Sequence, residues 1–324
     1  MQEENKKNAE VSPLYSEFAY DDAFRTMETE CDDIVIPFVN YFYNENYDKS
    51  AIITRMRNEH FIEHQDKSDE KRITDSHFTI TYKGESKKYH WECESTKYDG
   101  SMLVKLFEYD SQIAIDEATI GKSVLRVRFP NTGVLLLRKT AKVSDEACII
   151  LETPGGNVEY DVKVAKVSDF SIDSIFESKL YILIPFYIFN YERHFKVINK
   201  DSAKTEELAE VYRNIIDRLD RELDKGNLSA YSYGVIIRLT HKVLYKLTMK
   251  HKVVQEKVGG VMGGKVLDLP EVKLYHQGLE EGEKKGLKKG LKKGLRKGAD
   301  ERKKLQSEID ELKKELADLK ALIK

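Results

Sequence analysis

The residues best suited to chemistry lie around YHWECES, at positions 89 to 95. His90, Glu92 and Glu94 alternate there, so on a β-strand their side chains share one face. Asp75 lies in an earlier alternating segment, and a hairpin can bring its carboxylate across from the glutamates. Carboxylate oxygens bind Mg²⁺ or Mn²⁺, which promote phosphodiester hydrolysis. The spacing therefore permits a divalent-metal site, although an alternating polar strand is more commonly a solvated face.

The eight histidines show no metal-binding spacing. His77 and His90 are the two nearest to the acidic residues, and we expect both to be half-exposed strand residues. The chain has no nucleophile elbow, no phosphate-binding P-loop and no G-x-G-x-x-G motif. These absences leave the acidic residues as the main candidates for catalysis.

The elements that must position these acids follow from periodicity. Apolar residues at helical spacing predict two N-terminal helices, over 16–30 and 32–43. Period-2 alternation on both sides of KGES predicts two antiparallel strands joined by a tight turn at 83–86. Helical spacing returns over 99–119, with Asp99 or Ser101 as the N-cap. The apolar stripe of that helix contains five residues: Met102, Leu106, Tyr109, Ile113 and Ala114.

Beyond this helix, the pattern is again that of strands. SVLRVRF, GVLLLRK, ACIILET and VEYDVKVAKV predict four strands between residues 123 and 166, with PNTG and PGGN as turns. Two helices follow, over about 203–224 and 229–256, and GGVMGGKVLDLP is interpreted as a linker. The order of elements predicts a mixed α/β layer structure with a helical C-terminal extension.

The net charge of −2 conceals a strongly basic segment. Residues 283 to 304 contain eleven Lys or Arg and three acids, a net charge of +8, which leaves −10 on the rest. Glycine recurs every fourth position from 278 to 298, which disfavours a stable helix. The segment is either a flexible tether or an arm that neutralises nucleic-acid phosphates. The candidate phosphate-binding residues are Lys288, Lys289, Lys292, Lys293, Arg296 and Lys297.

The last twenty residues carry a heptad pattern. Apolar residues alternate spacings of four and three, which is the a/d seam of a coiled coil. The seam consists of Leu305, Ile309, Leu312, Leu316, Leu319 and Ile323. Glu308 and Glu315 at g face Lys313 and Lys320 at e of a parallel partner, so we predict a parallel homodimer. The alternative is an amphipathic helix that folds back on the body.

Several features bear on the compartment. Three unevenly spaced cysteines suggest free thiols, and the polar leader, residues 1–14, is predicted to be disordered. The most apolar run, YILIPFYIFNY at 181 to 191, is too short to span a bilayer. We therefore expect a cytoplasmic protein that does not bind membranes.

ITDSHFTI followed by YHWECESTKYDGSMLVKLFEYDSQIA resembles the core of the PD-(D/E)XK nuclease superfamily, in its transposase-like, recombination-promoting branch. YDDAFRTM is similar to the opening helix of that branch, through Asp21, Phe24 and Arg25. The resemblance covers about residues 15 to 200. It implies a restriction-endonuclease-like mixed β-sheet flanked by helices, with Asp75 and Glu92 holding the ion.

The resemblance also implies that Lys105 and Tyr109, one helical turn apart, face the same site. Glu94 departs from the pattern, because the superfamily has Lys there and this branch usually Gln. Three outcomes are open. Glu94 is an extra metal ligand or general base, Lys105 supplies the missing cation, or the site has lost activity.

Together these inferences divide the chain into five parts. A leader (1–14) precedes a PD-(D/E)XK nuclease-like core (15–200), a helical extension (201–258), a basic Gly/Lys-rich linker (259–304) and a coiled coil (305–324). The predicted function is Mg²⁺- or Mn²⁺-dependent DNA endonuclease activity, associated with transposition or recombination. The alternative is a catalytically inactive, nuclease-fold DNA-binding or scaffolding dimer.

Overall fold

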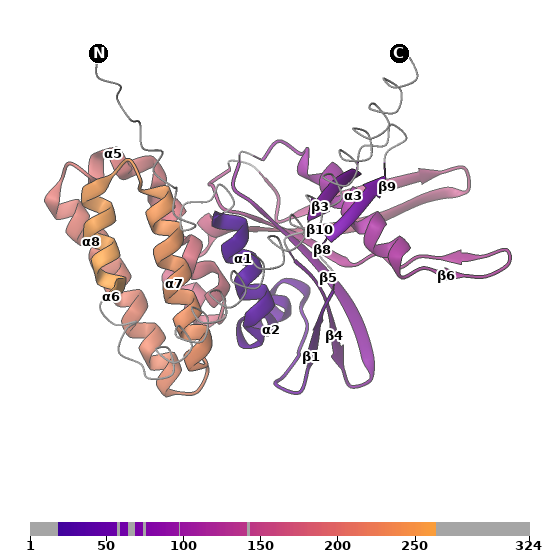
Figure 1. Cartoon of the computed structure of the whole chain (residues 1–324), viewed down its shortest axis with the longest axis horizontal. Helices are drawn as coiled ribbons and strands as arrows, with labels where there is room; N and C mark the ends of the chain where they lie inside the picture. Colours follow the sequence, from indigo (N-terminus) through magenta and orange to yellow (C-terminus); the bar gives the residue numbers. More distant parts are fainter. Residues whose placement is uncertain are drawn as a thin grey trace, which may run out of the picture. The chain divides into compact units, whose positions relative to one another are not determined.

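A six-stranded mixed sheet organises the fold (Figure 1). The computed structural model describes residues 19–56, 59–63, 69–73, 76–96, 98–140 and 143–263. The strands in spatial order are β1 (Ile52–Arg55), β4 (Ser76–Tyr82), β5 (Glu85–Glu94), β8 (Asn131–Leu136), β10 (Gly156–Lys166) and β9 (Glu146–Thr153). Helices pack against the sheet, so the predicted mixed α/β architecture is confirmed at this level.

The β4–β5 hairpin carries the candidate site strand. Its register pairs Ser76 with Trp91 and His77 with His90. Lys83 and Gly84 connect the strands with positive φ angles of 51° and 85°, the left-handed conformation that a two-residue hairpin turn requires. The predicted strand pair and its tight turn are therefore confirmed.

A helical crossover makes the sheet mixed. Helix α3 (Met102–Asp116) connects β5 to β8, which pairs parallel to both β5 and β10. Parallel neighbours need such a crossover, whereas β9 pairs antiparallel to β10 through a short turn at Pro154–Gly155. The predicted helix over 99–119 is confirmed, and all five residues of its apolar stripe are buried.

One predicted turn is wrong, because PNTG lies largely within β8. Gly133 pairs with Trp91 across the parallel ladder, and the indole ring lies against its Cα. A Cβ at this position would be 2.6 Å from Trp91 Cε2, so only glycine permits this close approach. The glycine therefore serves packing inside a strand, not a turn.

The two N-terminal helices and α3 cover opposite faces of the sheet. Helices α1 (Ala19–Glu30) and α2 (Asp32–Tyr43) are as predicted, and Val35 and Val39 of α2 pack in one core with Tyr89 of β5. On the other face, Met102 and Leu106 of α3 pack in a second core. The sheet residues of this second core are Val134, Leu136, Val162 and Val164.

A group of helices follows the sheet, and α7 among them contacts α1 (Figure 1). They are α4 (Ile172–Glu177), the 3₁₀ helix η3 (Tyr181–His194), α5 (Phe195–Ile198), α6 (Ser202–Asp224), α7 (Ala230–Leu247) and α8 (Lys252–Gly263), preceded by the short 3₁₀ helix η2 (Val167–Asp169). The predicted helix 203–224 is confirmed by α6. The apolar run 181–191 lies within η3, and no helix in the described part of the chain has the length and apolarity to cross a bilayer.

The single helix predicted over 229–256 is wrong. It divides into α7 and α8 after Leu247, where the Thr248 hydroxyl donates to the Leu244 carbonyl at 2.6 Å. The break lets α8 fold back against α6 and α7. A sequence window with continuous apolar spacing does not reveal such a reversal.

The linker expected from residue 259 is also corrected, because α8 continues to Gly263. Val254, Val258 and Met262, at helical spacing, are buried. A Cβ at Gly259 would lie 3.2 Å from Tyr245 Cε2, so the glycine allows close helix packing. The described residues from 19 to 263 belong to one compact unit. The leader 1–14, residues 264–304 of the basic linker and the coiled coil 305–324 lie outside the described residues.

Two small hairpins lie outside the main sheet. The strand predicted over SVLRVRF is confirmed only in part, because the segment forms the two-residue β7 (Leu125–Arg126), which pairs with β6 (Thr119–Ile120). Strands β2 (Glu59–Glu63) and β3 (Asp69–Ile73) form a second hairpin that the periodicity did not reveal. Both are local pairs, and neither extends the six-stranded sheet.

Candidate active site

The polar face of β5 is buried under α3. His90 and Glu92 are both 0% exposed, although alternation alone suggested a solvated face. The expectation that His77 and His90 are half-exposed is therefore wrong, because His77 is also buried, directly across the hairpin. A charged side chain buried this deeply requires partners.

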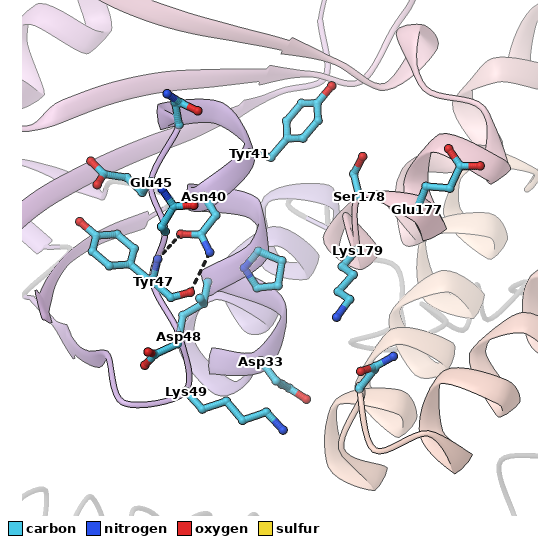
Figure 2. Close-up of a pocket in the computed structure, with 15 residues that line it drawn as sticks. Asp33, Asn40, Tyr41, Glu45, Tyr47, Asp48, Lys49, Glu177, Ser178 and Lys179 are labelled. Atoms are coloured by element: carbon cyan, nitrogen blue, oxygen red, sulfur yellow. Dashed lines mark hydrogen bonds between the residues drawn. The ribbon is translucent and has the colours of Figure 1, made fainter.

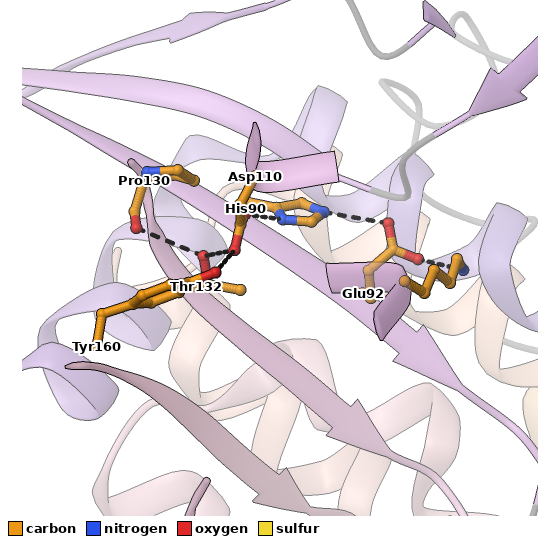
Figure 3. A network of polar contacts seen from close by, with 7 residues as sticks. His90, Glu92, Asp110, Pro130, Thr132 and Tyr160 are labelled. Atoms are coloured by element: carbon orange, nitrogen blue, oxygen red, sulfur yellow. Dashed lines mark hydrogen bonds and ion pairs between the residues drawn. The ribbon is translucent and has the colours of Figure 1, made fainter. Parts of the chain in front are cut away.

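Glu92 binds two nitrogen atoms from different elements (Figure 3). Its Oε2 lies 2.5 Å from Lys105 Nζ on α3, and its Oε1 lies 3.2 Å from His90 Nε2. Burial opposes ionisation of Glu92, but the His90 hydrogen bond and the charges of His90 and Lys105 outweigh it and lower its pKa. Glu92 is therefore ionised at neutral pH.

His90 connects Glu92 to a second buried carboxylate. His90 Nδ1 lies 2.7 Å from Asp110 Oδ1. Because both ring nitrogens face carboxylate oxygens, each nitrogen must carry a proton to donate. Burial lowers the pKa of His90, but the bonds to Asp110 and Glu92 prevail and raise it to about 9. Asp110, His90, Glu92 and Lys105 thus form a chain in which acidic and basic side chains alternate.

Neighbouring hydroxyls complete the surroundings of Asp110. Thr132 Oγ1 on β8 donates to Asp110 Oδ2 at 2.8 Å, and Tyr160 OH on β10 lies 3.4 Å from the same oxygen (Figure 3). The Tyr109 ring meets the His90 ring edge-on, with centroids 5.9 Å apart. These contacts connect α3 to three adjacent strands of the sheet.

Asp21 on α1 lies within the electrostatic field of this cluster. Burial raises the pKa of Asp21 to about 6, Lys105 opposes the rise, and the charge of Glu92 adds to it. Arg25, one helical turn later on α1, lowers the pKa of Asp21. Phe24, between them, is buried and packs against Phe38. The opening helix therefore brings Asp21 toward the carboxylate strand.

The other predicted site residues lie in different surroundings. The half-buried Glu94 accepts a hydrogen bond from the backbone N–H of Thr96 at 2.5 Å. Lys105 Nζ lies 5.4 Å from the centroid of the Tyr109 ring, and its side chain is 41% exposed. Lys105 therefore contacts Glu92, and Tyr109 lies beside Lys105 and His90. Asp75 lies outside the described residues.

Sequence reasoning missed Asp110 and the role of His90. Asp110 is 0% exposed and belongs to the buried stripe of α3, four residues after Leu106 and three before Ile113. An acid in the middle of an apolar stripe was a detectable signal, because a buried acid needs a partner. The partner itself, twenty positions away, could not be identified from spacing.

The residues near Glu92 meet only part of what a divalent metal ion requires of its ligands. Asp21, Glu92 and Glu94 supply the hard oxygen atoms that Mg²⁺ prefers. Among the residues that the structure describes, however, no three His, Cys, Asp or Glu side chains converge as a metal-binding group. The basic residues Lys288, Lys289, Lys292, Lys293, Arg296 and Lys297 lie outside the described part, as does the apolar seam of the coiled coil.

A separate pocket of about 620 Å³ lies between α2 with its following loop and the end of α4 (Figure 2). The side chain of Asn40 holds the following loop there, bonding both the N–H and the C=O of Tyr47 at 2.9 Å. Lys49 and Lys179 also line it. No residue of the Glu92 cluster contributes to this pocket, so its volume says nothing about the candidate site.

Comparison with known proteins adds no relative. No family model matches the chain, and searches of curated proteins and of solved structures give no match.

Proposed function

We propose that this protein is a Mg²⁺- or Mn²⁺-dependent DNA endonuclease with a restriction-endonuclease-like fold. The order of elements supports this proposal: an opening helix, an antiparallel strand pair, a carboxylate on the second strand, a helix with a cation, and a parallel strand. The observation that carries it is the buried Glu92 with Lys105 Nζ 2.5 Å from its Oε2.

Each residue has a proposed role. Asp75 and Glu92 would hold the divalent ion, which as a Lewis acid polarises the phosphodiester when bound. Lys105 is half-exposed and can turn from Glu92 toward a substrate phosphate, where its charge stabilises negative charge that develops there. Asp21, with a pKa of about 6, is suited to accept a proton from water near neutral pH.

The geometry favours one of the three outcomes for Glu94. Lys105 contacts Glu92 directly, whereas Glu94 accepts a backbone hydrogen bond from Thr96. We therefore propose that Lys105 supplies the cation that position 94 lacks. Glu94→Gln should leave nicking within a few-fold of wild type, and Lys105→Gln should reduce it more strongly.

The catalytically inactive alternative rests on a specific observation. Both oxygens of Glu92 already bind protein groups, and the described residues contain no complete metal-binding group. In that case the carboxylate would be part of the core, and the protein would bind DNA or act as a scaffold without cleaving it.

Plasmid nicking in Mg²⁺, Mn²⁺ or EDTA separates the two functions. Glu92→Gln should reduce metal-dependent nicking by at least about 100-fold, because it removes the proposed ligand charge. Glu85→Gln, an exposed position on the same strand, is the matched control. Thermal unfolding checks that Glu92→Gln is folded. If it is folded and nicks as fast as wild type, Glu92 is not catalytic.

We also propose a parallel homodimer through residues 305–324 and phosphate contacts by the basic linker. The dimer would set two single-strand-cutting sites on one duplex. Analytical ultracentrifugation of the full chain and of residues 1–300 tests the dimer. An unchanged mass on truncation contradicts it.

A further inference from the structure

The β6–β7 hairpin is a projecting ribbon with an unusual surface. It begins three residues after α3 ends and extends away from the six-stranded sheet (Figure 1). Lys88 of β5 anchors its base through an ion pair with Glu117 at 2.5 Å. Every residue from Thr119 to Arg128 is exposed, so the hairpin has no core of its own.

The hairpin is basic within an acidic body. No Asp or Glu occurs from Ala118 to Ser144, although the chain outside residues 283–304 carries a net charge of −10. Lys122, Arg126 and Arg128 belong to this acid-free stretch. The ion pair at the base of the hairpin joins Lys88 and Glu117, and none of the three cations has an ion-pair partner among the described residues. The hairpin therefore presents to solvent three cations that no acid of the described residues pairs with.

Apolar side chains accompany these cations. Ile120 pairs with Leu125 across the ribbon, and the two are 83% and 61% exposed. Thr119 pairs with Arg126 on the opposite face. Large apolar side chains on a projecting ribbon cost free energy in water, which a bound partner can recover.

The position of the hairpin relates it to the candidate active site. Lys105 and Asp116 are eleven residues apart on α3, which corresponds to ~16 Å along the helix axis. DNA rises ~3.4 Å per base pair, so this length spans about five base pairs. A duplex with a phosphate at the half-exposed Lys105 can therefore reach the hairpin when it lies along α3.

We propose that the β6–β7 hairpin is a duplex-DNA contact that holds the substrate about five base pairs from the phosphate to be cut. A two-stranded ribbon fits the major groove. Lys122, Arg126 and Arg128 contact phosphates, and Ile120 and Leu125 contact base edges or sugars. The proposal deepens the proposed function, on which its reference to a cut phosphate rests.

Fluorescence anisotropy of the full chain with labelled duplex DNA, in EDTA, tests this contact without cleavage. Each lost phosphate contact lowers the slope of log K against log salt by ~0.9. The triple variant K122Q/R126Q/R128Q should therefore bind more weakly, with a slope reduced by about 2.7. The matched control K196Q/K200Q/K250Q removes the same charge from exposed sites on the helical part and should leave the slope unchanged.

The apolar pair has its own test. Ile120→Ser with Leu125→Ser should weaken binding about tenfold and leave the slope unchanged, because no phosphate contact is lost. An unchanged slope in the triple variant overturns the proposal. A second result also overturns it: the triple variant binds DNA as well as wild type does but no longer binds anionic phospholipid vesicles that wild type binds. That result would assign the hairpin to a membrane surface.

The failure of the proposed function is distinguishable from the failure of this contact. If the wild-type chain does not nick DNA but the triple variant has a smaller slope of log K against log salt, the hairpin contact stands and the endonuclease proposal falls. If nicking requires Glu92 but the slope does not change in the triple variant, the endonuclease stands and the hairpin proposal falls.

Discussion

The two faces of strand β5 are buried alike and are chemically opposite. On the α2 side, Trp91 packs against Phe38 and Phe42, with ring centroids 4.6 and 5.2 Å apart. On the α3 side, His90 and Glu92 are as completely buried as Trp91, but directional polar contacts to Asp110 and Lys105 hold them there. Alternation places the residues of β5 on two faces. The helix that packs on each face determines whether its residues make apolar or polar contacts.

The comparison has an energetic consequence. A close-packed apolar face tolerates changes that preserve its volume, and is sensitive to clashes and cavities. A buried charged face is sensitive to loss of a buried partner, because the remaining charges stay uncompensated and out of reach of water. The same strand should therefore respond differently to mutations on its two sides.

Removing Asp110 should have the largest effect on stability. Asp110→Ala takes away one of the two carboxylates beside His90, and we expect a loss of ~3–5 kcal/mol in the free energy of unfolding. Urea unfolding at pH 7 measures it. Asp116→Ala, exposed on the same helix, should cost no more than about 0.5 kcal/mol and serves as the control. A loss below about 1 kcal/mol for Asp110→Ala would show that the polar face contributes little.

The pH dependence of stability should reveal the charge of His90. The pKa of His90 rises from 6.5 when unfolded to about 9 when folded, so its contribution is complete below pH 6.5 and is lost as pH rises through 9. This difference between the folded and unfolded pKa values of His90 corresponds to about 3 kcal/mol in the free energy of unfolding.

Urea unfolding between pH 6.5 and 9.5 should show this fall in wild type. The double variant H90Q/D110N, which replaces the charges with a neutral amide pair, should show a smaller one. Equal falls in the two proteins would assign the pH dependence to other groups. Glu28 is one such group, since burial raises its pKa to about 7.

The apolar face should respond to added volume. Gly133→Ala places a Cβ against the buried Trp91 ring, and overpacking of this kind costs ~1–3 kcal/mol. Gly155→Ala, in the β9–β10 turn with no atom closer than 4.0 Å, is the matched control. If thermal unfolding shows equal midpoints for the two variants, the sheet shifts to accept the methyl group.

Lys105 should matter least for stability. Its side chain is 41% exposed, so solvent screens the ion pair with Glu92, and Lys105→Gln should cost less than about 1 kcal/mol. A strong reduction of nicking with this small loss of stability would separate a functional cation from a structural one. A loss of several kcal/mol would place Lys105 with the buried partners of Glu92.

Much of the local structure was readable from the sequence. Helices α1, α2, α3 and α6 and the β4–β5 hairpin follow from hydrophobic period and turn residues. The shared face of His90, Glu92 and Glu94 follows from strand geometry. The predictions were wrong where contacts between residues far apart in the sequence determine the structure. Examples are the strand at Gly133, which packs beneath Trp91, and the reversal of the chain after Thr248.

By itself, then, the sequence determined which elements form and which side chains share a face, because those depend on neighbours a few positions away. The tertiary structure decided that the face of His90 and Glu92 is buried and that Asp110 and Lys105 meet it. Asp110 and His90 are twenty positions apart, and only the packing of α3 on the sheet brings them together. Burial then favours their pairing strongly, since an uncompensated charge in the interior removes a large fraction of the free energy of unfolding.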